Sequence, residues 1–175
     1  MLAQISQQNY FQLFDQPENY KVNLSDIQDK FRQLQKQYHP DNFAYQAPEQ
    51  LNQALATSSV INQAYNTLIQ PLSRAIYLLQ LHGIDVDLVH DTKFSQSFLF
   101  EQIELREQIG EAEENQDFDA LEVIEQGLKA KSKSLELNIE QSFQTRNFVE
   151  IRELIKHLAF YNKLEQLVNN ILAQM

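Results

Sequence analysis

The chain has 175 residues, of which 43% are hydrophobic and 22% charged, and it contains no cysteine. This is the composition of an ordinary globular protein, and without cysteine the chain has no disulfide framework, thiolate metal site or catalytic thiol. The formal net charge of −10 argues against non-specific binding to nucleic acid or an anionic membrane. No apolar run reaches the ~18 residues that a membrane-spanning helix needs.

Charge, proline and glycine divide the chain into two parts. All four prolines lie within the first 71 residues, and all three glycines follow them. Residues 1–77 carry five basic and six acidic residues, whereas residues 78–175 carry nine and eighteen, so net charges of −1 and −9 give the total of −10. We therefore predict two domains, 1–77 and 94–175, joined by a segment 78–93 that holds a helix end and an acidic linker.

Helical periodicity dominates the first domain, and strand-like alternation is weak everywhere. A short aromatic helix around Tyr10 stops before Pro17. The next helix follows a plausible N-cap at Asn23 and ends near His39, because Pro40 disfavours helical angles at the residue before it. The apolar stripe of this helix comprises Leu24, Ile27, Phe31, Leu34 and Tyr38.

The remaining helices follow from the same periodicity. One begins at Pro48, which suits a first helical turn, and is interrupted by Pro71; a further short helix runs on to a C-terminal glycine, Gly83. Three longer patterns occupy residues 94–114, 117–144 and 147–173. We therefore predict an all-α fold. Because three helices with short links can close a small antiparallel bundle, we expect these three to form one. The stripe after Pro48 comprises Leu51, Leu55, Ser58, Ile61, Tyr65 and Leu68.

A His-Pro-Asp tripeptide, His39 to Asp41, separates the second and third predicted helices. Alone it is equally compatible with a helix C-terminus and turn, in which His39 bonds terminal carbonyls. Its surroundings are more specific, because a short aromatic helix precedes the pair and the entering helix carries Lys30, Arg32 and Lys36. We place Lys30 and Lys36 beside the apolar stripe and Arg32 on another side. This context resembles the J domain of DnaJ-type co-chaperones.

Further segments resemble one family of J-proteins. Four of them are similar to the HscB family of bacterial iron–sulfur cluster assembly: Ile61–Tyr65, Pro71–Ala75, Tyr77–Gly83 and Phe98–Glu107. The similarity covers about residues 9–172. It implies a co-chaperone, not an enzyme, that delivers the scaffold protein IscU to the DnaK-like chaperone HscA and stimulates the ATPase of HscA. It also implies a bacterial, cytoplasmic protein.

The same resemblance assigns roles to the first domain. His39, Pro40 and Asp41 would form the activating loop, and the three basic residues would form the docking face for the chaperone. The chemistry is consistent, because proline fixes φ near about −65°, aspartate is an acceptor and histidine has a tunable charge. J domains commonly carry lysine after this tripeptide, and here the residue is Asn42, so one docking charge is missing. Basic residues on a helix are also often just a solvated face.

A second candidate surface lies on the predicted helix 94–114. At about 100° per residue, a core stripe of Phe98, Leu105, Ile109 and Ala112 faces away from apolar Phe100 and Ile103 and several carboxylates. Apolar patches with a charged border often mark partner sites. In the last helix, Phe160 lies outside the stripe of Leu154, Leu158, Tyr161, Val168 and Leu172, so we expect it to extend this patch.

In the HscB family this region binds IscU. By resemblance the binding residues are Leu99, Phe100, Ile103, Glu104, Glu107, Glu111 and Phe160. The alternative is that these residues pack against the J domain or another bundle helix, and for Leu99 the two interpretations are equally good.

Other functions are less well supported by the residues. His82, His90 and His157 lack the spacing of a shared metal site and are expected at helix ends or on the surface, and no Gly-rich phosphate loop occurs, so we expect no metal or cofactor. Residues 1–10 contain no basic residue and resemble neither a secretory signal nor a transit peptide. A general co-chaperone for unfolded proteins, or a dimerisation bundle with an inert J-like half, are the alternative functions.

Overall fold

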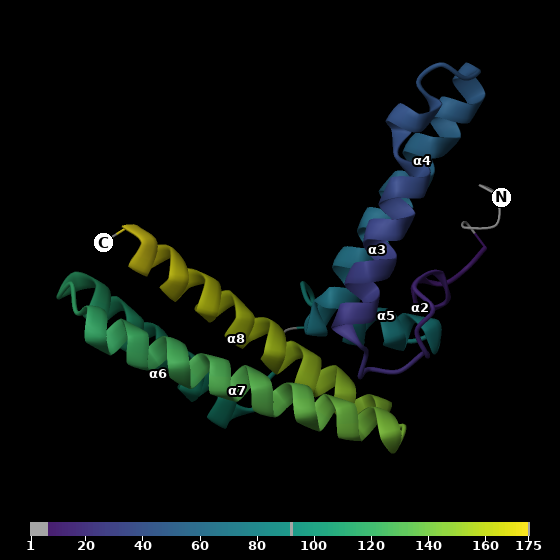
Figure 1. Ribbon diagram of the computed structural model, residues 1–175. Helices are drawn as coiled ribbons and strands as arrows, with labels where there is room; N and C mark the ends of the chain where they lie inside the picture. Colours follow the sequence, from purple (N-terminus) through teal and green to yellow (C-terminus); the bar gives the residue numbers. More distant parts are fainter. Residues whose placement is uncertain (1–6, 92, 175) are drawn as a thin grey trace. The chain divides into compact units, whose positions relative to one another are not determined.

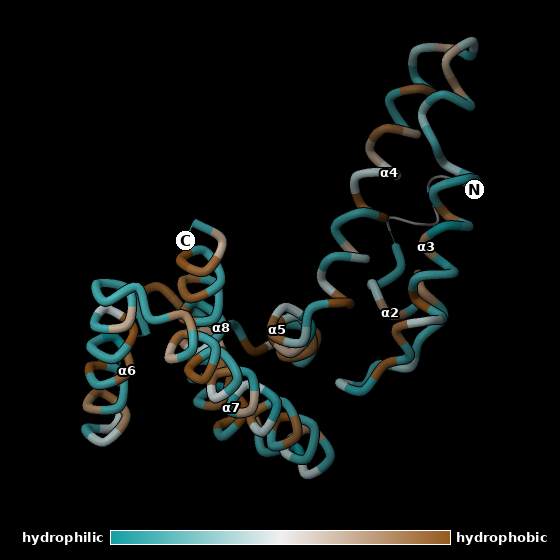
Figure 2. Tube along the Cα trace, turned by 60° about the vertical axis from the view of Figure 1, so that its left-hand side comes forward, coloured by the Kyte–Doolittle hydropathy of each residue, from teal (hydrophilic) through white to brown (hydrophobic). Residues whose placement is uncertain are grey.

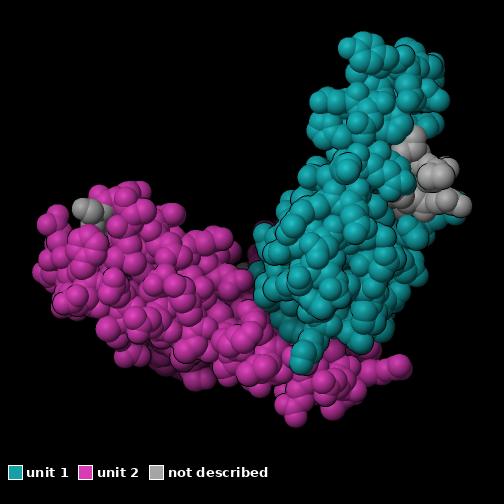
Figure 3. Space-filling view, viewed as in Figure 1, with its two compact units in different colours: residues 1–84 teal, residues 85–175 magenta. Residues whose placement is uncertain are grey.

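A computed structural model of the chain describes residues 7–91 and 93–174. The regular structure of these residues is entirely helical, which confirms the predicted all-α fold (Figure 1). The chain forms two compact units, one ending at Ile84 and the other beginning at Asp85 (Figure 3). Residues 1–6, where the sequence predicts no signal or transit peptide, lie outside the described residues. Within the described ranges, no helix has the length and apolar character of a membrane span.

The first unit contains a long helical hairpin. Its elements are the helices α2 (Tyr10–Leu13), α3 (Leu24–Tyr38), α4 (Pro48–Ile69) and α5 (Pro71–Leu81) and the short 3-10 helix η1 (Pro40–Phe43). Helices α3 and α4 lie side by side (Figure 1). The predicted cap is present, because the Asn23 side chain accepts hydrogen bonds from the amides of Ser25 and Asp26. Gly83 follows α5 with φ of 75°, the left-handed conformation expected of a glycine after a helix.

The core of the first unit differs from the predicted apolar stripes at two places. Helix α4 buries small side chains at Ala54 and Thr57, while Leu55 is 50% exposed. The predicted stripe runs through Leu55 and Ser58, but at this end of the hairpin α4 turns Ala54 and Thr57 inward. Leu24 is also exposed, since it occupies the first position of α3, before the first buried residue, Ile27.

The second unit consists of three helices, α6 (Gln96–Glu114), α7 (Phe118–Gln144) and α8 (Phe148–Gln174). Helices α7 and α8 form an antiparallel pair in contact along their lengths, and α6 packs beside them (Figure 1). Ser95 and Asp117 cap α6 and α7 by accepting hydrogen bonds from the third amide of each helix. Along α6, hydrophilic and hydrophobic residues alternate, as expected of a helix with one buried side (Figure 2).

The predicted position of Phe160 is wrong. Its side chain is only 7% exposed and belongs to the core of the second unit, where its ring packs edge-on against Phe98, with centroids 5.3 Å apart. Helix α8 packs against both of its neighbours, so it buries a broader surface than a single stripe, including the consecutive residues 158–161. Phe160 therefore packs against the buried side of α6, at Phe98, and does not extend the exposed patch.

Candidate partner-binding sites

The His-Pro-Asp tripeptide spans the junction between two helices. His39 ends α3 in an extended conformation, and Pro40 begins η1. The Nδ1 atom of His39 accepts a hydrogen bond from the backbone N–H of Asp41 at 3.3 Å and lies 3.5 Å from the Asp41 carboxylate. The two side chains are nevertheless 57% and 88% exposed. The chain thus holds an imidazole and a carboxylate together while presenting both to solvent.

The Asn42 side chain caps the helix that ends at this corner. Its side-chain amide donates a hydrogen bond to the backbone carbonyl of Lys36 at 2.8 Å. The last carbonyls of a helix lack partners within the helix, so this bond caps the end of α3. The residue that replaces the lysine common in J domains therefore helps to fix the position of the His39–Asp41 corner.

The three basic residues of α3 do not share one surface. Arg32 and Lys36 are four residues apart, so they project from the same side of the helix, and both are exposed. Arg32 is also 3.6 Å from the carboxylate of Asp29. Lys30 is half-buried and forms an ion pair of 2.5 Å with Asp15. The predicted grouping of Lys36 with Lys30 is therefore wrong, because Lys36 lies on the same side of α3 as Arg32, while Lys30 packs against the segment after α2.

The patch on α6 is exposed. Leu99, Phe100 and Ile103 are 44%, 63% and 55% exposed, so the alternative in which they pack inside the bundle is excluded. The acidic residues Glu104 and Glu107 on the same helix are exposed as well, as is Glu111 one turn later. We refer to these six residues as the α6 patch. In chemical terms it is an apolar surface with a border of negative charge.

A polar contact joins all three helices beside the α6 patch. The carboxylate of Glu101 in α6 accepts a hydrogen bond from the Tyr161 hydroxyl in α8 at 2.9 Å and another from Lys131 in α7. Burial alone would raise the pKa of Glu101, but these hydrogen bonds outweigh it and hold the pKa below its ordinary value of 4.5. Burial and the bond to Glu101 raise the pKa of the Tyr161 hydroxyl. Sequence analysis missed this contact, because the three residues are far apart in the chain.

An open groove of about 550 Å³ lies at this contact, and His157 lines it together with Glu101, Lys131 and Tyr161. His157 was predicted at a helix end or on the surface, but it is half-buried, and its ring stacks on Phe98 with centroids 3.9 Å apart. Burial lowers the pKa of His157 below its ordinary value of 6.5. In the described residues no cluster of three or more potential metal ligands occurs, at His157 or elsewhere.

The lowered pKa of His157 predicts a pH-dependent stability. The unfolded chain binds a proton at a higher pH than the folded chain, so the free energy of unfolding should decrease as the pH falls below about 6.5. Replacing His157 with phenylalanine retains a ring against Phe98 and removes the titration. Urea unfolding at about pH 7 and pH 5 should show a smaller loss of stability on acidification in His157→Phe than in the wild type. Equal losses would contradict this assignment.

Comparison with known proteins identifies the family. Residues 9–77 match the DnaJ domain, and residues 94–169 match the HSCB C-terminal oligomerisation domain. A co-chaperone protein HscB homolog of Neisseria meningitidis is 31% identical over 163 residues, which cover 93% of this chain and 98% of that protein. The chain belongs to the HscB family. The human iron–sulfur cluster co-chaperone protein HscB is 33% identical over 158 residues, which cover 90% of this chain and 66% of the human protein.

Solved structures agree with this assignment. The crystal structure of human co-chaperone protein HscB superposes with a TM-score of 0.87 and 32% identity, covering 93% of this chain and 81% of that chain. Chaperone HscB from Vibrio cholerae gives the same TM-score and identity, covering 95% and 99%. The predicted family is therefore confirmed: this is a co-chaperone of iron–sulfur cluster assembly and not an enzyme. Its J domain implies an Hsp70-type partner.

Proposed function

We propose that this HscB-family chain is an adaptor between two proteins. One unit would engage the DnaK-like chaperone HscA and stimulate its ATPase, and the other would hold the iron–sulfur scaffold protein IscU. The observation that supports this most directly is the presence of two exposed surfaces of different chemistry on two separate compact units, the His39–Asp41 corner and the α6 patch. The cytoplasm of a bacterium is the compartment that we propose for this function.

The proposed chaperone contact relies on the exposed corner. Among the residues that the structure describes, the side chains of His39 and Asp41 contact only the backbone amide of Asp41 and each other, so they are available for new hydrogen bonds with a partner. Arg32 and Lys36 add positive charge on the helix that leads into the corner, and such charges mainly accelerate encounter with an acidic partner. A residue set of this kind performs no chemistry itself. It stabilises one conformation of the chaperone over another, and the chaperone's own site then hydrolyses ATP.

The proposed scaffold contact relies on the α6 patch. Large apolar side chains near the centre of an interface contribute most of the binding free energy, and a charged border selects the partner and its orientation. Phe100 and Ile103 are the most exposed apolar residues of α6, so they are the natural anchors. Glu104, Glu107 and Glu111 would favour a partner with a basic rim. Phe160, which the resemblance also suggested as a scaffold contact, is buried and contributes no exposed surface.

Connecting the two contacts in one chain has a kinetic advantage. A scaffold bound to the second unit stays within reach of a chaperone bound to the first, at an effective concentration that is about millimolar for short linkers. Neither contact then needs high affinity. The high effective concentration would promote capture of the scaffold by the chaperone as ATP is hydrolysed.

A competition experiment distinguishes this proposal from a general co-chaperone for unfolded proteins. Binding of purified, folded IscU to the full chain should be saturable and should persist in excess of several denatured proteins. The acid-bordered α6 patch is a small and specific surface, so denatured proteins should not displace the scaffold. Displacement by denatured proteins would instead favour the general co-chaperone. Scaffold binding without any ATPase stimulation of HscA would favour a bundle with an inert J-like half.

A further inference from the structure

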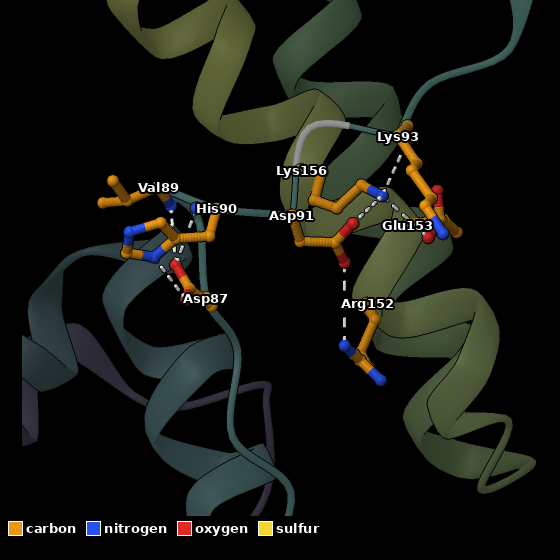
Figure 4. Close-up of polar contacts among 8 residues, drawn as sticks. All are labelled: Asp87, Val89, His90, Asp91, Lys93, Arg152, Glu153 and Lys156. Atoms are coloured by element: carbon orange, nitrogen blue, oxygen red, sulfur yellow. Dashed lines mark hydrogen bonds and ion pairs between the residues drawn. The ribbon is translucent and has the colours of Figure 1, made fainter.

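A lysine in α8 is almost completely buried in the second unit. The side chain of Lys156 is 3% exposed. Its ammonium group donates to the backbone carbonyl of Lys93 at 2.8 Å, to the Glu153 carboxylate at 3.0 Å and to the Asp91 carboxylate at 3.3 Å (Figure 4). An ammonium group has three N–H donors, so each of them has an acceptor. Sequence analysis did not single out Lys156.

Most of these partners belong to the segment that leads into α6. The second carboxylate oxygen of Asp91 is 3.6 Å from the guanidinium of Arg152, so two cations of α8 hold one linker residue (Figure 4). The ammonium of Lys156 also lies 5.1 Å from the ring centroid of Phe94, within the range of a cation–π interaction. Lys156 therefore contacts the chain at Asp91, Lys93 and Phe94.

His157, the residue after Lys156, contacts α6 itself. The ring of His157 stacks on Phe98, and Phe94 packs against Phe98 with centroids 5.2 Å apart. Phe98 lies in the first turn of α6, directly before Leu99 and Phe100. Two consecutive residues of α8 therefore contact the start of α6: Lys156 binds the segment before the helix, and His157 packs against its first turn.

Helix α6 is held in place by less buried surface than α8 is. It buries three of its 19 residues, Phe98, Ile109 and Ala112, whereas α8 buries ten of 27. The apolar side chains that α6 exposes contribute nothing to holding it in place. A helix with so little buried surface depends on a few contacts for its position. At the end that carries Leu99 and Phe100 these are the packing of Phe98, the bonds of Glu101 to α7 and α8, and the Lys156 contacts just before the helix.

We propose that Lys156 is a positioning residue for scaffold binding: by fastening Asp91, Lys93 and Phe94 to α8, it fixes the start of α6 and therefore the orientation of the α6 patch. This inference rests on the proposed function of the patch. Lys156 does not touch the partner. It reduces the number of orientations that α6 samples before binding, so less ordering is needed when the scaffold docks.

The test replaces Lys156 with methionine, which keeps the length of the side chain and removes the charge. In the full chain, hydrogen exchange of the backbone amides at 94–100 should accelerate by about tenfold or more, because the substitution removes the ammonium group that connects Asp91 and Lys93 to α8 and so promotes local opening. Affinity for IscU should fall by about three- to tenfold. Stimulation of the HscA ATPase without scaffold should be unchanged, since the first unit is intact.

Two controls separate positioning from general destabilisation. Lys133→Met removes a comparable but exposed ion pair, to Glu136 at 3.1 Å, and should leave scaffold affinity unchanged. Ile139→Val destabilises the α7–α8 core without removing any of the groups that contact Lys156, and should also bind the scaffold normally. If Ile139→Val weakened binding as much as Lys156→Met, the effect would be one of stability and the inference would be overturned.

The outcomes are distinguishable from failure of the proposed function. If the wild-type chain does not bind IscU, the proposed function itself is contradicted. If the wild type binds and Lys156→Met binds equally well, only the role of Lys156 is contradicted. Should Lys156→Met fail to fold, Asp91→Asn is the second variant: it weakens the same contact from the linker side, and faster exchange at 94–100 with weaker binding would support the inference. Unchanged exchange and binding in Asp91→Asn would overturn it.

Discussion

Replacing His39 with glutamine should reduce stimulation of the HscA ATPase to the unstimulated rate, while affinity for IscU stays unchanged. Glutamine keeps a polar side chain of similar size but lacks the imidazole ring and its two ring nitrogens. Hydrogen bonds that involve charged groups contribute about 1.5–3 kcal/mol each. At about 1.4 kcal/mol per factor of ten, loss of one such bond to the active conformation of the chaperone lowers the stimulation by about 10- to 150-fold.

The fold should tolerate this substitution. The His39 side chain is 57% exposed, and within residues 7–91 and 93–174 its one hydrogen bond is the long contact with the Asp41 amide. We therefore expect a change in the free energy of unfolding within about 0.5 kcal/mol. His82→Gln changes an exposed histidine in the same unit and should leave stimulation intact. Single-turnover ATPase measurements with HscA check both variants, and full stimulation by His39→Gln would contradict the proposed role of the corner.

The second large effect concerns the α6 patch. Replacing Phe100 and Ile103 together with alanine should weaken IscU binding by about 30- to 1,000-fold, since two anchor side chains contribute about 2–4 kcal/mol when they become buried in an interface. The two side chains are 63% and 55% exposed in the free chain, so their removal should not destabilise the bundle. Titration calorimetry measures the affinity, and thermal unfolding checks the fold.

A matched pair of substitutions tests whether the position of the patch matters. Val123 and Leu137 are 68% and 57% exposed on α7, so Val123→Ala with Leu137→Ala removes a similar exposed apolar surface from another helix. This variant should bind IscU like the wild type. Both variants should stimulate the HscA ATPase normally when scaffold is absent. Equal loss of affinity in the two variants would show that the scaffold does not recognise α6 specifically.

The local pattern of the sequence was sufficient to predict most helices. Asn23 and Pro40 delimit α3, and Pro71 separates α4 from α5, because capping side chains and proline act on the backbone within a few residues. The exposure of Phe100 and Ile103 could also be predicted, since carboxylates on the same side of a helix exclude that side from the core. In both cases the physical cause is contained in a short segment.

Features that depend on contacts between distant residues could not be predicted. Phe160 is buried because α8 packs against two helices, and a one-helix stripe cannot represent a second neighbour. Lys30 is engaged by Asp15, fifteen residues earlier in the chain. The burial of Lys156 is less predictable still, because charged side chains are normally exposed and only the folded linker supplies its acceptors. A rotation of about 100° per residue gives the side of a helix on which a side chain lies, but it does not show which other helices pack against that side.

The adaptor proposal is tested most directly by separating its two contacts between two molecules. His39→Gln retains the α6 patch, and Phe100→Ala with Ile103→Ala retains the His39–Asp41 corner. At limiting IscU, we compare scaffold-dependent ATPase activity of HscA in the presence of the wild-type chain and of an equimolar mixture of the two variants. If one chain must hold both partners, the mixture should fail to restore the wild-type rate. A mixture that is as active as the wild type would contradict delivery by a tethered scaffold.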